Sequence, residues 1–74
     1  MTFVQSLSIE AVAYDEATHR LRAKFRADGR IVVYKNVPQD VYDSLIFADS
    51  LGDYFLEHIE GAYPARVISK GKGH

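Results

Sequence analysis

His-Arg-Leu-Arg-Ala-Lys-Phe-Arg, residues 19–26, alternates polar and apolar side chains with a period of two. Successive side chains of a β-strand point to opposite faces, so Leu21, Ala23 and Phe25 share one face of this segment. The other face carries four basic residues: Arg20, Arg22, Lys24 and Arg26. The pattern predicts a strand that buries its apolar face and leaves a cationic face in water.

Two neighbouring strands are expected from the same kind of pattern. β-Branched and aromatic residues alternate with polar ones in Ser8–Tyr14 and Arg30–Lys35, and a short extension can be drawn at Phe3–Ser6. Turn-forming residues separate these runs from the basic strand, at Asp15–Thr18 and Ala27–Gly29. The front of the chain therefore predicts a three-stranded antiparallel meander.

The middle of the chain is predicted to be helical. Pro38 suits a first helical position, and apolar residues then recur at helical spacing as far as Ala48. Ser50 followed by Asp53 resembles a capping box, so a second helix is expected to begin there and to end at Gly61. We therefore expect an α+β domain of order βββαα, with the meander packed against two C-terminal helices.

A chain of 74 residues is short enough to be one domain with one core. We place the domain at residues 1–64 and expect residues 65–74 to be a basic, flexible tail, because the last residues lack an apolar pattern. The predicted core is Val12, Leu21, Phe25, Val41, Leu45, Phe55 and Ile59, with either Ile31 and Val33 or Val32 and Tyr34.

The face on which Tyr34 lies depends on the turn that precedes its strand. A three-residue loop, Ala27–Gly29, puts Tyr34 beside Arg22 on the basic face. A two-residue turn at Asp28–Gly29 shifts the register by one residue and buries Tyr34 with Phe25. The two loops therefore predict opposite environments for the tyrosine.

Composition excludes several classes of protein. Hydrophobic residues make up 47% and charged residues 26% of the chain, as in ordinary folded domains. There is no cysteine, which excludes disulfides, thiolate zinc sites and thiol nucleophiles. No apolar run approaches the roughly 20 residues that cross a bilayer, and no signal-peptide pattern is visible, so we expect no membrane partner and a cytoplasmic location.

The net charge of −1 conceals a separation of charge along the chain. Residues 1–35 contain six basic and four acidic side chains, whereas residues 36–64 contain six acidic side chains and no Lys or Arg. The end of the chain adds Arg66, Lys70 and Lys72. The folded protein is therefore expected to have a strongly uneven electrostatic field.

No residue pattern predicts an enzyme. His19, His58 and His74 share no metal-ligand spacing, and Gly52 is not part of a glycine-rich phosphate loop. Ser50 is explained as a helix cap and lies in no Gly-x-Ser-x-Gly motif. We therefore expect no catalytic residue, no metal and no cofactor.

A set of residues spread over positions 4–63 carries a family resemblance: Val4, Ser6, Ala13-Tyr14-Asp15, Leu21, Phe25, Gly29, Tyr34, Val37-Pro38, Val41-Tyr42, Ala48, Ser50, Gly52, Tyr54-Phe55, Ile59 and Tyr63. Together they resemble the KTSC domain, which is named for a segment at the C-terminus of some lysyl-tRNA synthetases and also occurs as free-standing small bacterial proteins. The resemblance implies a role in RNA binding, and the strand spacing of the family favours the three-residue loop. The family's Tyr-x-Tyr element is Val32-Val33-Tyr34 here, so only the second tyrosine is kept.

The basic face and the resemblance together predict a small module that binds RNA or single-stranded DNA. Basic side chains about 7 Å apart along a strand can contact successive phosphates, and an aromatic ring among them can stack on a base. The predicted contact residues are Arg20, Arg22, Lys24, Arg26, Tyr34 and Lys35. The alternative is a non-enzymatic module for protein interaction or homodimerisation that covers the same face.

Overall fold

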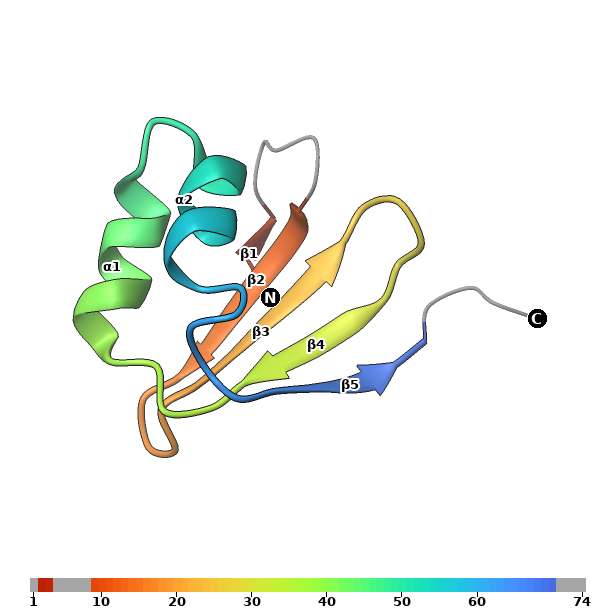
Figure 1. The fold of residues 1–74 in the computed structure, drawn as a ribbon, viewed down its shortest axis with the longest axis horizontal. Helices are drawn as coiled ribbons and strands as arrows, with labels where there is room; N and C mark the ends of the chain where they lie inside the picture. Colours follow the sequence, from red (N-terminus) through yellow and green to blue (C-terminus); the bar gives the residue numbers. More distant parts are fainter. Residues whose placement is uncertain (1, 4–8, 71–74) are drawn as a thin grey trace.

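A five-stranded antiparallel sheet with two helices on one side makes up the part of the chain that the computed structural model describes, residues 2–3 and 9–70. The elements in chain order are β1 (Thr2–Phe3), β2 (Ile9–Asp15), β3 (Arg20–Phe25), β4 (Ile31–Tyr34), α1 (Gln39–Phe47), α2 (Leu51–His58) and β5 (Ala65–Ser69). The strands lie in sequence order across the sheet, and β5 forms one edge (Figure 1).

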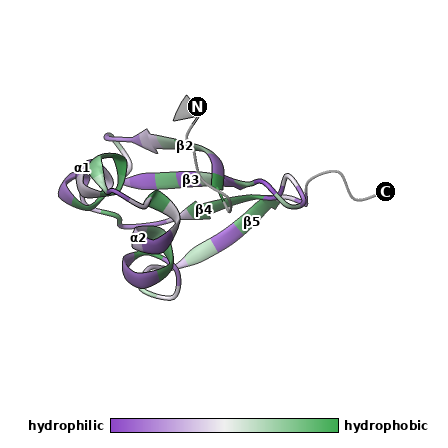
Figure 2. Ribbon diagram, turned by 90° about the horizontal axis from the view of Figure 1, so that it is seen from above, coloured by the Kyte–Doolittle hydropathy of each residue, from purple (hydrophilic) through white to green (hydrophobic). Residues whose placement is uncertain are grey.

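The predicted α+β class, with an antiparallel sheet and two helices, is confirmed, but the sheet is larger than three strands. β5 pairs with β4, with Val67 opposite Val32 and Arg66 opposite Val33. The prediction of a flexible tail is therefore wrong for Ala65–Ser69, which is a largely hydrophobic strand with one hydrophilic segment (Figure 2). Residues 71–74 of the predicted tail, and all but Phe3 of the predicted Phe3–Ser6 extension, lie outside the described residues.

The core lies between the helices and one face of the sheet. Five predicted core residues are fully buried: Val12, Leu21, Leu45, Phe55 and Ile59. Phe25 and Val41 pack against this cluster and are partly buried. The Phe55 ring meets two sheet aromatics edge to face, with centroid distances of 5.8 Å to Phe25 and 5.1 Å to Tyr34. This ring therefore joins α2 to both β3 and β4.

The register between β3 and β4 buries Tyr34. Leu21 pairs with Tyr34, and the tyrosine is only 3% exposed on the side of the sheet that faces the helices. The connecting loop has four residues, 26–29, because the amide of Phe25 donates to the carbonyl of Arg30 at 2.8 Å and Gly29 adopts a φ of 72°. The expected three-residue loop and the alternative two-residue turn are therefore both wrong. Of the two alternatives for the core, it is Val32 with Tyr34 that belongs to the cluster between the sheet and the helices.

Packing and charge both favour the observed register. Shifting β4 by one residue would move the Tyr34 ring to the other face of the sheet and away from its contact with Phe55. The three-residue loop would also set Arg30 opposite Arg26, which is unfavourable for like charges. In the observed register Arg30 instead lies over the Phe25 ring, with its guanidinium carbon 4.8 Å from the centroid.

The helix boundaries follow the predicted signals closely. Pro38 is the N-cap of α1, with an extended backbone, so the helix begins one residue later than predicted. Ser50 caps α2 as predicted, because its Oγ accepts a hydrogen bond from the Asp53 amide at 3.4 Å. Gly61, with a φ of 80°, follows the helix and lets the chain turn toward β5.

The buried tyrosine makes the stability of the fold sensitive to high pH. Burial, with a smaller contribution from Glu60, raises the pKa of Tyr34 from 10.0 to about 12. Because the pKa is higher in the folded state, the protonated Tyr34 side chain contributes to the free energy of unfolding. This contribution is complete below about pH 10 and is lost as the pH rises to about 12. We expect the urea midpoint of the wild type, followed by circular dichroism, to fall over this window.

The variant Tyr34→Phe cannot ionise at this position and keeps the ring against Phe55. Its urea midpoint should therefore fall less steeply than that of the wild type between about pH 10 and pH 12. An equal pH dependence in the two proteins would show that Tyr34 does not ionise on unfolding as described.

Candidate functional site

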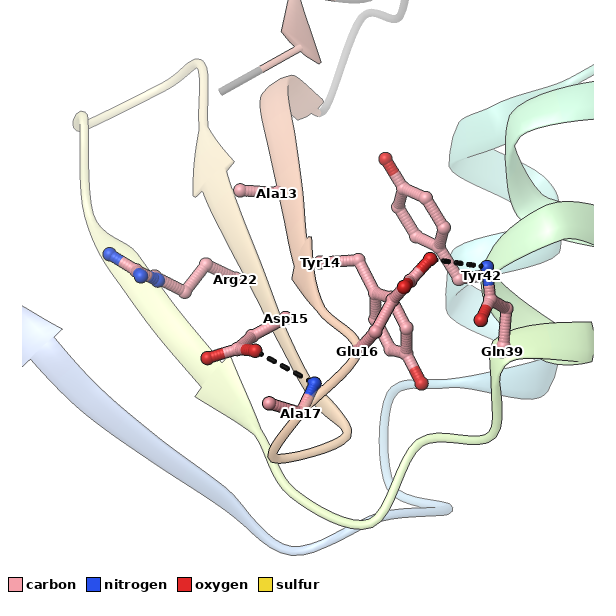
Figure 3. A pocket seen from close by; sticks show the side chains of 8 residues that line it. All are labelled: Ala13, Tyr14, Asp15, Glu16, Ala17, Arg22, Gln39 and Tyr42. Carbon is pink, nitrogen blue, oxygen red and sulfur yellow. Dashed lines mark hydrogen bonds between the residues drawn. The ribbon is translucent and has the colours of Figure 1, made fainter.

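The side of the sheet away from the helices, here called the outer face, carries the predicted basic surface. The strand registers align Ala13, Arg22, Val33 and Arg66 in one row across β2, β3, β4 and β5. Their neighbours along the strands, such as Leu21 and Val32, lie in the core, so this row points to the outer face. Figure 3 shows Arg22 pointing away from the helices, on the opposite side from Tyr42.

Four cationic residues surround Val33 on the outer face: Arg20 and Arg22 of β3, Lys35 directly after β4, and Arg66 of β5. We call these four residues the basic cup. Two adjoining hollows of about 340 Å³ and about 240 Å³ lie here and share Arg20, Val33 and Ile68. Although neither α1 nor α2 covers it, Val33 is only 9% exposed, because the long side chains that line the hollows cover it.

The charge of the basic cup is only partly compensated. Within residues 9–70, no salt bridge involves any of its four side chains. Asp15 lines the smaller hollow with Arg20 and Arg22. Hydrogen bonds from Thr18 and from the Ala17 amide, and then the charge of Arg22, lower the pKa of Asp15 below its ordinary 3.8, so the carboxylate is ionised at neutral pH. Four cations and one carboxylate leave the site three charges positive.

The structure brings together only part of the predicted contact set. Arg20, Arg22 and Lys35 belong to the basic cup, but Lys24 Nζ forms an ion pair with Glu10 Oε2 at 3.4 Å. Arg26 lies in the loop after β3 and lines neither hollow.

Tyr34 was predicted to be a stacking platform, and this is wrong, because its ring is buried against Phe55. The observed register puts Val33, an aliphatic residue, at the corresponding place on the outer face.

Arg66 is the member of the basic cup that the sequence interpretation missed, because it was assigned to the tail. A signal for it exists: the run Arg66-Val67-Ile68-Ser69 follows Pro64 and contains two adjacent β-branched residues between polar ones. Such a run is typical of a short edge strand, which would have placed Arg66 in the sheet.

A larger hollow of about 560 Å³ lies between the end of β2 and the start of α1 (Figure 3). The rings of Tyr14 and Tyr42 stack at 4.9 Å, and Tyr14 Oη donates to the carbonyl of Val37 at 2.6 Å. Gln39 Nε2 donates to Glu16 Oε1 at 2.9 Å. Because these polar groups bind one another, we interpret this region as the joint that holds α1 to the sheet.

Residues 2–3 and 9–70 form no metal site and no membrane-spanning helix. Among residues 2–3 and 9–70, no three His, Cys, Asp or Glu side chains lie close enough together to hold a metal ion. His58 is exposed on α2, where it packs on Tyr54 and lies 3.8 Å from the Glu57 carboxylate. In the described part of the chain, no helix has the length and apolar character needed to cross a membrane.

Comparisons with known proteins agree with this fold. The family model of the KTSC domain matches residues 5–63 of the sequence. A protein of Tsukamurella paurometabola is 39% identical over 51 residues, which cover 69% of this chain and 75% of that protein. The crystal structure of a KTSC domain protein from Yersinia pestis superposes with a TM-score of 0.88 at 29% identity, covering 92% of this chain and 94% of that one. The chain therefore belongs to the KTSC domain family.

Proposed function

We propose that this protein is a cytoplasmic, non-enzymatic module that binds single-stranded nucleic acid through the basic cup. The observation that carries the proposal is the convergence of four cationic side chains from neighbouring strands on one face, with three positive charges in excess. Contacts with phosphate supply most of the affinity of proteins for nucleic acids. RNA and single-stranded DNA both present such phosphates.

The lining of the site indicates how such a ligand would be recognised. Among the described residues, Val33, Val67 and Ile68 line the two hollows at the basic cup together with charged residues, and no aromatic side chain does so. Stacking of bases on aromatic rings is therefore not expected to contribute there. Binding should depend on phosphates and vary little with base sequence.

A salt titration tests the proposal. The logarithm of affinity should fall linearly with the logarithm of salt concentration, with a slope of about −0.7 for each phosphate charge that the basic cup neutralises. The limit of one charge for each of the four cations is a slope of about −2.8, at which raising the salt from 50 to 200 mM weakens binding about 50-fold. Fluorescence anisotropy with labelled 20-mers of oligouridine and oligothymidine measures this slope. Absence of binding at 50 mM salt, or a slope near zero, would refute the proposal.

The carboxylate beside the basic cup provides a second test. Asp15→Asn removes one negative charge next to Arg20 and Arg22, while the asparagine Oδ1 can still accept the hydrogen bond that the Ala17 amide donates at 2.9 Å. A charge about 7 Å from a phosphate in a water-like dielectric changes the affinity about threefold. We therefore expect Asp15→Asn to bind RNA about three times more tightly at low salt.

Asp28→Asn is the matched control for this change. Asp28 also accepts a backbone hydrogen bond within its loop, from the Arg30 amide at 2.9 Å, but it lines neither hollow at the basic cup. The same change in net charge at this position should leave the affinity close to that of the wild type. Equal gains in the two variants would mean that only the total charge matters.

A second candidate function, self-association or binding of an acidic protein, is favoured by the charge on the helices. Residues 36–64 contain no Lys or Arg, and the exposed residues of α1 and α2 include Asp40, Asp43, Asp53 and Glu57. The acidic helices of one copy are thus complementary in charge to the basic cup of another. Sedimentation velocity at 50 mM salt would then show a concentration-dependent mass, and RNA would dissociate the complex.

A further inference from the structure

We infer that the basic cup recognises a phosphomonoester, the terminal phosphate of a nucleic-acid strand. This inference rests on the proposed function and specifies which part of the strand the site binds. A terminal phosphate carries about −1.5 to −2 charges at neutral pH, whereas a phosphodiester within the strand carries one. A site with a concentrated positive charge therefore prefers the end of the strand.

The cations of the basic cup form a compact cluster, not a line. Continuing the register of β3 and β4 by one residue places Arg20 opposite Lys35, about 4.8 Å away across the sheet. Arg22 and Arg66 lie in the next row on either side of Val33, about 10 Å apart. The two rows are about 7 Å apart along the strands. Because the four cations surround Val33 and do not follow one strand, their arrangement suits one phosphate group with its attached nucleoside better than a line of successive phosphates.

Among the described residues, the row of the outer face next to the basic cup adds no unpaired positive charge. The next row beyond Val33 contains Ile31 and Ser69, which are uncharged, and Lys24, which is paired with Glu10 at 3.4 Å. At the other end, Asp15 places a negative charge beside Arg20. Phosphates on either side of the one bound in the basic cup would therefore meet neutralised or repulsive surface.

The floor of the site is suited to the nucleoside that carries the terminal phosphate. Val33 and Ile68 line both hollows, and Val67 joins them in the larger one. An aliphatic floor can contact the apolar edge of a ribose or the face of a base without selecting its identity. The site would thus bind a strand end of any sequence.

Three forms of one oligouridine 12-mer test this inference: with a 5′-phosphate, with a 3′-phosphate, and with hydroxyl groups at both ends. At pH 7.5 and 100 mM salt, we expect at least one phosphorylated form to bind about tenfold more tightly than the hydroxyl form. The preference should shrink at pH 5, where the second ionisation of the phosphomonoester, with a pKa near 6, is reversed.

Variants connect this preference to the basic cup. Arg20→Gln should reduce the ratio of the affinities for phosphorylated and hydroxyl strands to near one, because Arg20 lines both hollows. Ser44→Glu changes the net charge by the same amount at an exposed position of α1. This variant should preserve the ratio of the two affinities. A ratio that is unchanged in Arg20→Gln would overturn the assignment of the site.

The outcomes separate this inference from the proposed function. Equal binding of all three oligonucleotides by the wild type would overturn the inference and leave nucleic-acid binding intact. Failure of all three to bind would overturn both. Uridine 5′-monophosphate serves as a competitor. If it displaces the phosphorylated strand at an equal concentration, the ligand is a free nucleotide and not the end of a strand, which would overturn the inference.

Discussion

Simultaneous replacement of Arg22 and Arg66 with alanine is expected to weaken binding of oligouridine about 100-fold at 100 mM salt. The two arginines flank Val33 from β3 and β5 and are exposed on the outer face. Each charge-assisted hydrogen bond to a phosphate contributes about 1.5 kcal/mol, so loss of two costs about 3 kcal/mol of binding free energy. Fluorescence anisotropy should also show the salt slope falling to about half of its wild-type value, because two of the four cations are removed.

A control with the same net charge distinguishes local contacts from a general electrostatic effect. Ser44→Glu together with Leu56→Glu adds two negative charges on the helices, at an exposed position of α1 and at a leucine of α2 that is 53% exposed. This double variant should bind within a few-fold of the wild type. A comparable loss in the control would show that net charge, and not the basic cup, determines affinity.

The single variant Arg66→Ala tests the part of the site that the sequence interpretation missed. In a flexible tail, a lone arginine would contribute little to binding. In the sheet, Arg66 is held opposite Val33 by the pairing of β5 with β4, so its removal should cost about tenfold in affinity. An unchanged affinity would exclude Arg66 from the binding site.

Phe55→Ala is expected to lower the free energy of unfolding by about 3 to 5 kcal/mol. The Phe55 side chain is fully buried, and its ring contacts both Phe25 and Tyr34. A domain of this size has a total stability of about 4 to 11 kcal/mol, so this one substitution removes a large share of it. Urea denaturation followed by circular dichroism measures the change.

Phe47→Ala is the matched control, because Phe47 ends α1 and is 85% exposed. The same chemical change should alter stability there by no more than about 0.5 kcal/mol. If Phe55→Ala does not fold, Phe55→Leu still reports on the site, with an expected loss of about 1 to 2 kcal/mol. Equal stabilities of Phe55→Leu and Phe47→Ala would contradict the central packing role of Phe55.

Local patterns in the sequence determined much of the fold and one strand of the candidate site. The alternation in residues 19–26 predicted β3 and its two faces, since the direction of each side chain in a strand follows from the geometry of the backbone. The cap at Ser50 and the turn at Gly29 were also predicted, because both depend on short-range hydrogen bonds or on backbone φ. The pattern correctly placed Arg20 and Arg22 on the outer face.

Tertiary structure alone decided which side chains share that face. Local turn preferences left the placement of Tyr34 open. Burial of its ring against Phe55 selected the register that places Val33 on the outer face. Lys24 matches Arg22 in the sequence pattern, yet its pairing with Glu10 depends on how β2 and β3 align. β5 is short and mostly exposed, so its conformation depends on hydrogen bonds to β4, a partner about 30 residues earlier. The two faces of β3 could be predicted from the sequence because strand geometry is local. The basic cup arises from pairing between strands that are distant in the sequence, and these pairing interactions form only when the chain is folded.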